Sequence, residues 1–262
     1  MSYTNESVEQ IKRYINSYSG IDGGNQSAKI WICGIEYGGE VDKPEDIGEL
    51  TPITRDGIRA WDEKFKGEAW WAMRGKWVYH GRISKLMLYM MQDVMAKAVD
   101  VTSFWKSYRD NFLYAEDGNE FKLNLFPFSC PNEHAWGQCG FDKKSNYLVF
   151  CRNGENGESR FGKLHSLCKE LKPKVIIATG KTYCEDFQKA FGFEGDMKSC
   201  SLEVEGPQRN FLYKKDEGGT ALVVLPFPTG PQGLNKDAHL KVAARQIVKI
   251  SGLNMDDFPR SL

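Results

Sequence analysis

Residues 30–40 read Ile30-Trp31-Ile32-Cys33-Gly34-Ile35-Glu36-Tyr37-Gly38-Gly39-Glu40, an apolar run that passes directly into a glycine-rich segment. A continuous apolar run of this kind is typical of a strand buried on both faces, as in a parallel sheet. In open α/β sheets, a strand that ends in a glycine-rich loop presents chemistry at its carboxyl end. The stretch therefore predicts a parallel α/β protein with a ligand crevice at the edge where this strand ends.

Helices and strands are predicted to alternate along the rest of the chain. Helical spacing of apolar residues predicts helices near residues 6–18, 82–98, 103–110, 161–171, 181–191 and 236–251. Short apolar runs predict further strands near 123–128, 175–179, 199–204, 209–214 and 221–225, of which 199–204 and 209–214 should pair as a hairpin. This order predicts a three-layer α/β/α sandwich with a mainly parallel central sheet of four or five strands.

Composition excludes several classes of function. The 262 residues fit one α/β domain, expected to span 1–262 with an irregular tryptophan-rich insertion at about 41–81. Because 35 Lys and Arg balance 35 Asp and Glu, DNA binding through bulk charge is excluded, and any nucleic-acid contact must use a local patch. No apolar run approaches the roughly 18 residues of a membrane span, and no secretory leader is visible. We therefore expect a cytoplasmic protein without membrane contact.

Metal and nucleotide motifs are weak. Seven scattered cysteines without a Cys-x-x-Cys pair predict reduced thiols rather than a disulfide framework. The residues Cys130, His134, Cys139 and Cys151 share a loop region, but their spacings match no standard zinc pair, so we expect no metal site. Gly180-Lys181-Thr182 follows a strand, but Val175 stands where a phosphate-binding P-loop requires glycine, so a Walker-type nucleotide site is excluded.

Two loops that follow predicted strands have compositions that packing alone does not explain. The segment 34–39 places Glu36 among glycines, whose backbone a ligand can approach closely. Alternatively, the glycines only make a tight turn, and Glu36 is solvated or caps a helix. The proline-stiffened segment 226–235 offers Thr229, Asn235 and two glycines just ahead of a helix, which suits an anion clamp. Its alternative is a proline-rich connector in which Asn235 caps the helix.

A third segment, residues 61–85, interleaves aromatic side chains with cations. It holds six Lys and Arg against three acids, a local net charge of +3, among the aromatic residues Trp61, Phe65, Trp70, Trp71, Trp77 and Tyr79. Aromatic planes next to cations are typical of a platform on which unpaired bases stack. The alternative is that the tryptophans anchor a long loop onto the core.

The motifs and their order resemble the uracil-DNA glycosylase superfamily, most closely its mismatch-specific branch. Gly34-Ile35-Glu36-Tyr37-Gly38 is similar to the family's first motif, G-x-[D/N/E]-P-G, and Leu123–Phe128 is similar to its apolar strand ending near Asn and Pro. Lys172–Lys181 resembles its K-P-led strand and helix start, and Phe227-Pro228-Thr229-Gly230 corresponds to its second motif, H/N-P-S. The resemblance covers roughly residues 29–250.

Two departures from the family bear on activity. Tyr37 stands where the family has proline, and Phe227 stands where the most active members have a histidine that stabilises O2 of the departing base. Loss of one such donor typically costs on the order of 10²–10³ in rate. No cysteine precedes Cys33, whereas the iron–sulfur branch needs a close pair there, so no cluster and no cofactor is expected.

The resemblance implies a DNA-repair hydrolase that cleaves the N-glycosidic bond of a damaged or deaminated base flipped between the two loops. It implies that Glu36 activates water or stabilises the positive charge developing on the sugar, and that Asn124 reads the base edge. The implied base pocket comprises Gly34, Tyr37, Gly38, Asn124, Phe126 and Phe227. The implied phosphate- and DNA-binding residues are Pro228, Thr229, Gly230, Asn235, Arg74 and Lys76. The alternative is a catalytically inactive protein that keeps the pocket for a nucleic acid or nucleotide-like ligand; Phe227 favours it, whereas Glu36 favours the enzyme.

Overall fold

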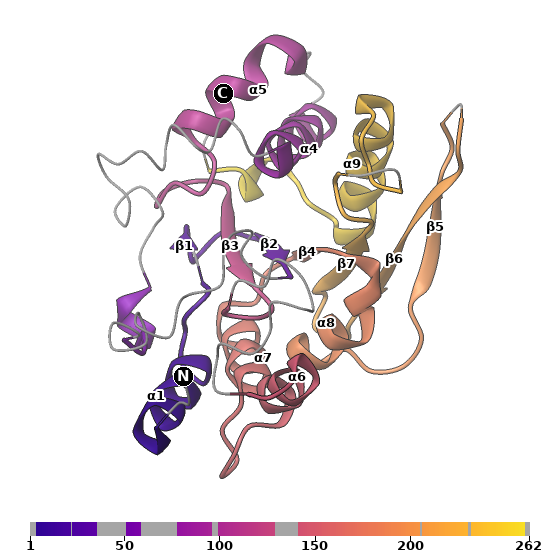
Figure 1. Cartoon of the computed structure of the whole chain (residues 1–262). Helices are drawn as coiled ribbons and strands as arrows, with labels where there is room; N and C mark the ends of the chain where they lie inside the picture. Colours follow the sequence, from indigo (N-terminus) through magenta and orange to yellow (C-terminus); the bar gives the residue numbers. More distant parts are fainter. Residues whose placement is uncertain are drawn as a thin grey trace.

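The computed structural model of the chain describes residues 4–21, 23–35, 51–58, 78–95, 99–128, 141–204, 206–229 and 232–259. Within them lies a mixed sheet of seven strands in the order β1-β3-β2-β4-β7-β6-β5 (Figure 1). The strands are β1 (Gly23–Gly24), β2 (Ile30–Gly34), β3 (Glu120–Asn124), β4 (Val175–Thr179), β5 (Lys198–Leu202), β6 (Arg209–Lys215) and β7 (Ala221–Leu225). The helices are α1 (Asn5–Ile15), α4 (Val78–Met95), α5 (Val101–Asn111), α6 (Lys144–Asn153), α7 (Arg160–Leu171), α8 (Cys184–Phe191) and α9 (Asp237–Ser251), with 3-10 turns η2 (Arg55–Gly57), η4 (Lys181–Tyr183) and η5 (Met255–Asp257).

The α/β class is confirmed, but the expected sheet is corrected in size and direction. The central strands β3, β2, β4 and β7 are parallel, whereas β1, β6 and β5 run antiparallel to their neighbours. The predicted hairpin forms as β5 and β6, and it extends the same sheet because β6 pairs with β7. The two-residue strand β1 is not predicted by the sequence, since Gly23 and Gly24 carry no side-chain pattern. The sheet is therefore mixed and larger than the four or five mainly parallel strands expected.

Helices cover both faces of the sheet (Figure 1). Alternate residues of each central strand face opposite ways, so Trp31 and Cys33 of β2 pack into the cluster formed with α1, α6, α7 and α8. Ile30 and Ile32 pack into the second cluster, formed with α4, α5 and α9. Both clusters are buried, which explains why β2, β4 and β7 read as nearly unbroken apolar runs. Within the described residues, none of the helices combines the length and apolarity that crossing a bilayer requires.

Several elements differ from their predicted positions. Helix α4 spans Val78–Met95 rather than 82–98, so it begins inside the segment predicted as an irregular insertion, and α1 ends at Ile15 rather than at residue 18. Strand β3 spans Glu120–Asn124, whereas the apolar run predicts a strand over 123–128. The prediction is displaced because β3 buries charged residues on one face. The apolar residues beyond Asn124 pack into the core after the strand ends, where the Leu125 and Phe126 amides still donate to the carbonyls of Gly34 and Ile35. Helix α6 lies within a segment predicted to be a loop. Its signal is present in the helical spacing of Tyr147, Phe150 and Cys151, all of which are buried.

The last helix confirms its prediction except at its first residue. Helix α9 buries Leu240, Ala243, Ala244 and Ile247, and it ends at Gly252, whose φ of 72° is the left-handed conformation typical of a helix end. The expected cap is wrong, because the helix begins one residue later than predicted. Lys236 occupies the N-cap position, and no side chain caps the helix there.

Candidate functional site

The carboxyl ends of four strands meet at one edge of the sheet. Gly34 at the end of β2 lies opposite Asn124 at the end of β3, and Thr179 at the end of β4 lies opposite Leu225 at the end of β7. These strands are parallel, so the loops that follow all leave from the same edge. This is where open α/β sheets place their ligand crevice.

A hollow of about 390 Å³ opens at this edge, over β4, β6 and β7. It is lined by Ile35, Gly180, Lys181, Thr182, Gln208, Arg209, Asn210, Pro226, Phe227, Thr229, Gln232 and Gly233. Ile35 belongs to the loop that carries Glu36, and five lining residues belong to the proline-stiffened loop. The structure thus brings the described parts of both predicted loops to one hollow.

The hollow is cationic. Lys181 and Arg209 are its charged lining residues, and no acidic side chain lines it within the described part of the chain. Lys181 Nζ donates to Asn210 Oδ1 at 2.8 Å, which directs the ammonium toward β6. Two hydroxyls and further amides complete the polar lining. Guanidinium, ammonium and hydroxyl groups donate hydrogen bonds to phosphate oxygens, so the lining of the hollow suits an anion.

The first turn of α4 contributes an aromatic wall beside the hollow. The rings of Tyr79 and Phe227 lie 5.7 Å apart at 32°, and the Tyr79 hydroxyl is 3.3 Å from Thr179 Oγ1. Phe227 is 43% exposed, which is unusual for a large apolar side chain in this fold. An exposed ring beside a polar hollow can stack against a planar heterocycle.

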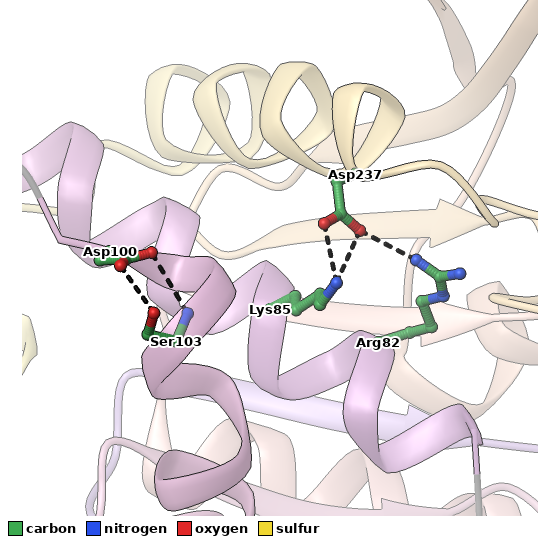
Figure 2. Close-up of polar contacts among 5 residues, drawn as sticks. All are labelled: Arg82, Lys85, Asp100, Ser103 and Asp237. Atoms are coloured by element: carbon green, nitrogen blue, oxygen red, sulfur yellow. Dashed lines mark hydrogen bonds and ion pairs between the residues drawn. The ribbon is translucent and has the colours of Figure 1, made fainter.

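Ion pairs hold this wall in place by joining α4 to α9. Asp237 in the first turn of α9 binds Lys85 at 2.7 Å and Arg82 at 3.0 Å, both from α4 (Figure 2). Figure 2 also shows Asp100 capping α5 through Ser103. Arg82 and Lys85 belong to the predicted cationic platform, but here they tether two helices. The remaining cations of that platform lie outside the described residues.

Under α4, β3 carries a buried polar pair. Lys122 and Asn124 are 3% and 2% exposed, and Lys122 Nζ donates to Asn124 Oδ1 at 2.7 Å. Gly34 lies directly against this pair, because a Cβ added there would come within 2.5 Å of Asn124 Oδ1. Asn124 therefore reaches the end of β2, two residues before Glu36, although it does not line the cationic hollow.

The remaining predicted site residues are distributed as follows. Thr229 and Phe227 line the hollow; Pro228 is buried between them, and Asn235 is exposed. Phe126 lies in the core on the opposite face of the sheet, against Tyr147, Phe161 and Tyr183, and so does not contribute to the hollow. Six further predicted residues lie outside the described residues: Glu36, Tyr37, Gly38, Gly230, Arg74 and Lys76.

Three residues outside the predicted base and phosphate sites belong to this edge: Lys122, Lys181 and Arg209. Tyr79 belongs to the segment 61–85 that the sequence predicts as a stacking platform, and its ring lies against Phe227. The sequence marks Lys181, because Gly180-Lys181-Thr182 follows a strand, but the segment does not match the P-loop motif. Arg209 begins an antiparallel strand, where no motif marks it. Lys122 is a charge within a strand, so no apolar run marks its position in the sequence.

Two of the described cysteines, Cys151 and Cys168, are buried thiols. Burial raises the pKa of Cys151 to about 12, and that of Cys168 also to about 12, so both thiols stay protonated. Within the described ranges, no three His, Cys, Asp or Glu side chains are grouped to hold a metal ion. Three of the four candidate zinc ligands lie outside those ranges: Cys130, His134 and Cys139.

His239 makes the stability of this edge sensitive to acid. It is 1% exposed, and neither ring nitrogen has a hydrogen-bond partner within the described residues. Burial lowers its pKa, and the positive charges of Arg209 and Lys236 lower it further. Above about pH 6.5 the ring is mostly neutral in both the folded and the unfolded chain. Below that pH, the ring is protonated more readily in the unfolded chain than in the folded chain. The free energy of unfolding should therefore fall as the pH drops below about 6.5.

The variant His239→Leu is expected to lose this acid sensitivity. Urea unfolding of wild type and variant at about pH 7.5 and about pH 5 should show the variant gaining in relative stability at the lower pH. Taking the difference between the two proteins cancels the titration of all other groups. A difference that is the same at both pH values would contradict a lowered pKa for His239.

No protein-family model matches the chain, and no curated protein matches it. The resemblance to the glycosylase superfamily accordingly stays a prediction drawn from the motifs.

Proposed function

We propose that this protein binds nucleic acid at the carboxyl edge of its sheet and hydrolyses the N-glycosidic bond of a damaged or deaminated base. The observation that carries the proposal is that described residues of both predicted loops line one hollow, and that the charged residues lining it are Lys181 and Arg209. A base-excising protein needs donors for the phosphates that flank the flipped nucleotide and a planar surface for the base. Phe227 and Tyr79 offer that surface.

In the proposed reaction, the phosphates next to the flipped nucleotide lie against Lys181 and Arg209, and the base enters toward Asn124. Water attacks C1′ of the sugar and gives its proton to the Glu36 carboxylate, while the electron pair of the glycosidic bond passes to the base. The same carboxylate stabilises the positive charge that develops on the sugar. Products are the free base and an abasic strand.

A second function is a protein that binds a nucleic acid or nucleotide without cleaving it. Phe227 favours this function, because it replaces a histidine with a side chain that cannot donate a hydrogen bond. In this case the cationic hollow would bind phosphate, and the aromatic wall would bind the base, with no turnover.

One experiment separates the two functions. The protein is incubated with single- and double-stranded oligonucleotides that contain uracil, hypoxanthine, xanthine or a mismatched thymine, and the strands are then cleaved at abasic sites. Excision of one or more bases is expected. Binding without release of any base supports the second function, and the lack of both contradicts each of them.

Phosphate binding predicts a specific effect of removing the two cations. The double variant Lys181→Gln/Arg209→Gln should bind a single-stranded oligonucleotide on the order of a hundredfold or more weakly, because charge-assisted hydrogen bonds contribute about 1.5–3 kcal/mol each. The slope of log affinity against log salt concentration should flatten by roughly 0.7 for each phosphate that the variant no longer neutralises. Fluorescence anisotropy at several salt concentrations measures both quantities.

The matched control carries the same charge change elsewhere. Lys189 lies on α8, where it binds Asn153, and Arg245 lies on α9 with a side chain that is 66% exposed. Neither lines the cationic hollow. The double variant Lys189→Gln/Arg245→Gln should keep the affinity and the salt slope of the wild type. Equal losses in both double variants would show that the effect comes from net charge and not from the hollow.

A further inference from the structure

Strand β3 carries charge where the neighbouring strands carry apolar side chains. On the face toward α4 and α5, it presents Glu120, Lys122 and Asn124, which are 0%, 3% and 2% exposed. Glu120 accepts hydrogen bonds from the Tyr108 hydroxyl at 2.9 Å and from the Tyr114 amide at 2.8 Å. Fully buried lysines are rare, because an ammonium loses its hydration on burial. The position of Lys122 therefore calls for a chemical reason.

Lys122 fixes the orientation of the Asn124 side chain. Its Nζ donates to Asn124 Oδ1 at 2.7 Å and to the Leu123 carbonyl at 2.9 Å. An ammonium can only donate, so Oδ1 is the atom that accepts, and Nδ2 is the donor end of the amide. Glycine at position 34 makes room for this arrangement, because a Cβ there would lie 2.5 Å from Asn124 Oδ1 and 3.3 Å from Lys122 Nζ. The pair thus lies at the end of β2, next to the loop that carries Glu36.

We infer that Lys122 is a positioning residue that, through Asn124, stabilises the negative charge on the departing base. The inference rests on the proposed function. When the C1′–N bond breaks, its electron pair goes to the base, which leaves as an anion and later takes a proton from solvent. A cation bonded to Oδ1 polarises the amide and strengthens donation from Nδ2 to a base carbonyl. In this way, Lys122 and Asn124 of β3 stabilise the negative charge on the departing base, whereas Phe227 has no hydrogen-bond donor with which to do so.

The sharpest test varies the acidity of the leaving base. Single-turnover excision is measured with uracil and with 5-fluorouracil, whose anion is more stable, in wild type and in Lys122→Met. The variant should be slower on uracil by on the order of 10²–10³, as for loss of a preorganised donor, and much less impaired on 5-fluorouracil. A merely structural role would slow both bases by the same factor. That outcome, or an unchanged rate on uracil, overturns the inference.

Two further variants distinguish an effect on catalysis from a general loss of folding. Lys174→Met removes a lysine that binds Asp257 at 2.7 Å ahead of β4, at the opposite end of the sheet, and should leave the ratio of the two rates unchanged. Gly34→Ala keeps both side chains but crowds them, because the added Cβ would lie 2.5 Å from Asn124 Oδ1 and 3.3 Å from Lys122 Nζ, and it should reproduce the selective loss on uracil. If Gly34→Ala slows both bases equally, Asn124 does not transmit the charge.

A binding measurement with wild-type protein keeps the inference separate from catalysis. The free base 5-nitrouracil ionises readily, and its absorbance distinguishes the anion from the neutral form. The protein should bind the anion preferentially, so that bound 5-nitrouracil ionises at a lower pH than in buffer, and Lys122→Met should abolish the difference. If the wild type excises bases but shows no preference for the anion, the inference fails and the proposed function stands. If it excises nothing, the enzyme proposal fails and the role of Lys122 in base departure fails with it; a preference for the anion would then show only that the pair favours an anionic base.

Discussion

Glu36→Gln is expected to reduce base excision by on the order of 10²–10⁴, the usual contribution of a positioned general base. Glutamine keeps the size of the side chain but can neither accept the proton of the attacking water nor offset the positive charge that develops on the sugar. Affinity for the oligonucleotide should not fall, because removing a carboxylate reduces repulsion of the phosphates. Single-turnover excision and anisotropy binding, measured on the same substrate, separate the two effects.

The control for this prediction is Glu203→Gln, which neutralises an exposed carboxylate just after β5. It should excise bases at the wild-type rate. Should Glu36→Gln also keep that rate in an active protein, Glu36 would not be the group that activates water. Weaker binding with an unchanged rate of the bound complex would instead assign Glu36 a role in holding the substrate.

Arg160→Met is expected to lower the free energy of unfolding by several kcal/mol, the largest stability effect of any single change considered. Arg160 is fully buried in the first turn of α7 and donates to the carbonyls of Asn124 at 2.8 Å, Ser17 at 3.0 Å and Leu125 at 3.4 Å. Each buried carbonyl left without its donor costs about 1–3 kcal/mol. Methionine fills much of the volume but offers no donor, so all three losses occur together.

Chemical unfolding monitored by circular dichroism checks this expectation. Arg245→Met provides the comparison, because that side chain is 66% exposed, and a surface change of this kind usually stays within about 0.5 kcal/mol. Arg160→Lys should fall between the two, since a single ammonium cannot reach three carbonyls as the guanidinium fork does. A loss for Arg160→Met no greater than that for Arg245→Met would show that the turn after β3 does not depend on this side chain.

How accurately the sequence predicts each strand depends on how polar the residues of that strand are. Strands β4 and β7 are predicted residue for residue, because both are apolar on each face and end at glycine or proline. The prediction for β3 is displaced, because Glu120 and Lys122 are charged residues that the strand buries. Glu120 accepts hydrogen bonds from Tyr108 and Tyr114, and Lys122 donates to Leu123 and Asn124 of its own strand. Nothing local to 198–215 indicates that the hairpin joins the central sheet rather than standing apart, since strand pairing is a tertiary property.

The candidate site is predictable where a motif follows a strand. The loop with Thr229 and the loop that begins at Ile35 are expected to share one hollow, and their described residues do so. Arg209 cannot be assigned in the same way, because it reaches the edge from β6, an element without a motif. Tyr79 belongs to the aromatic segment 61–85 that the sequence predicts as a stacking platform. The place of Glu36 itself stays a prediction.

Hydrogen exchange of the protein with and without a saturating single-stranded oligonucleotide, read by mass spectrometry, tests most directly whether nucleic acid occupies this edge. We predict slower exchange in peptides that cover residues 179–183, 207–211 and 226–235, and unchanged exchange in α1 and α6, which do not line the hollow. Protection of α1 and α6 with no change at those three segments would contradict the assignment.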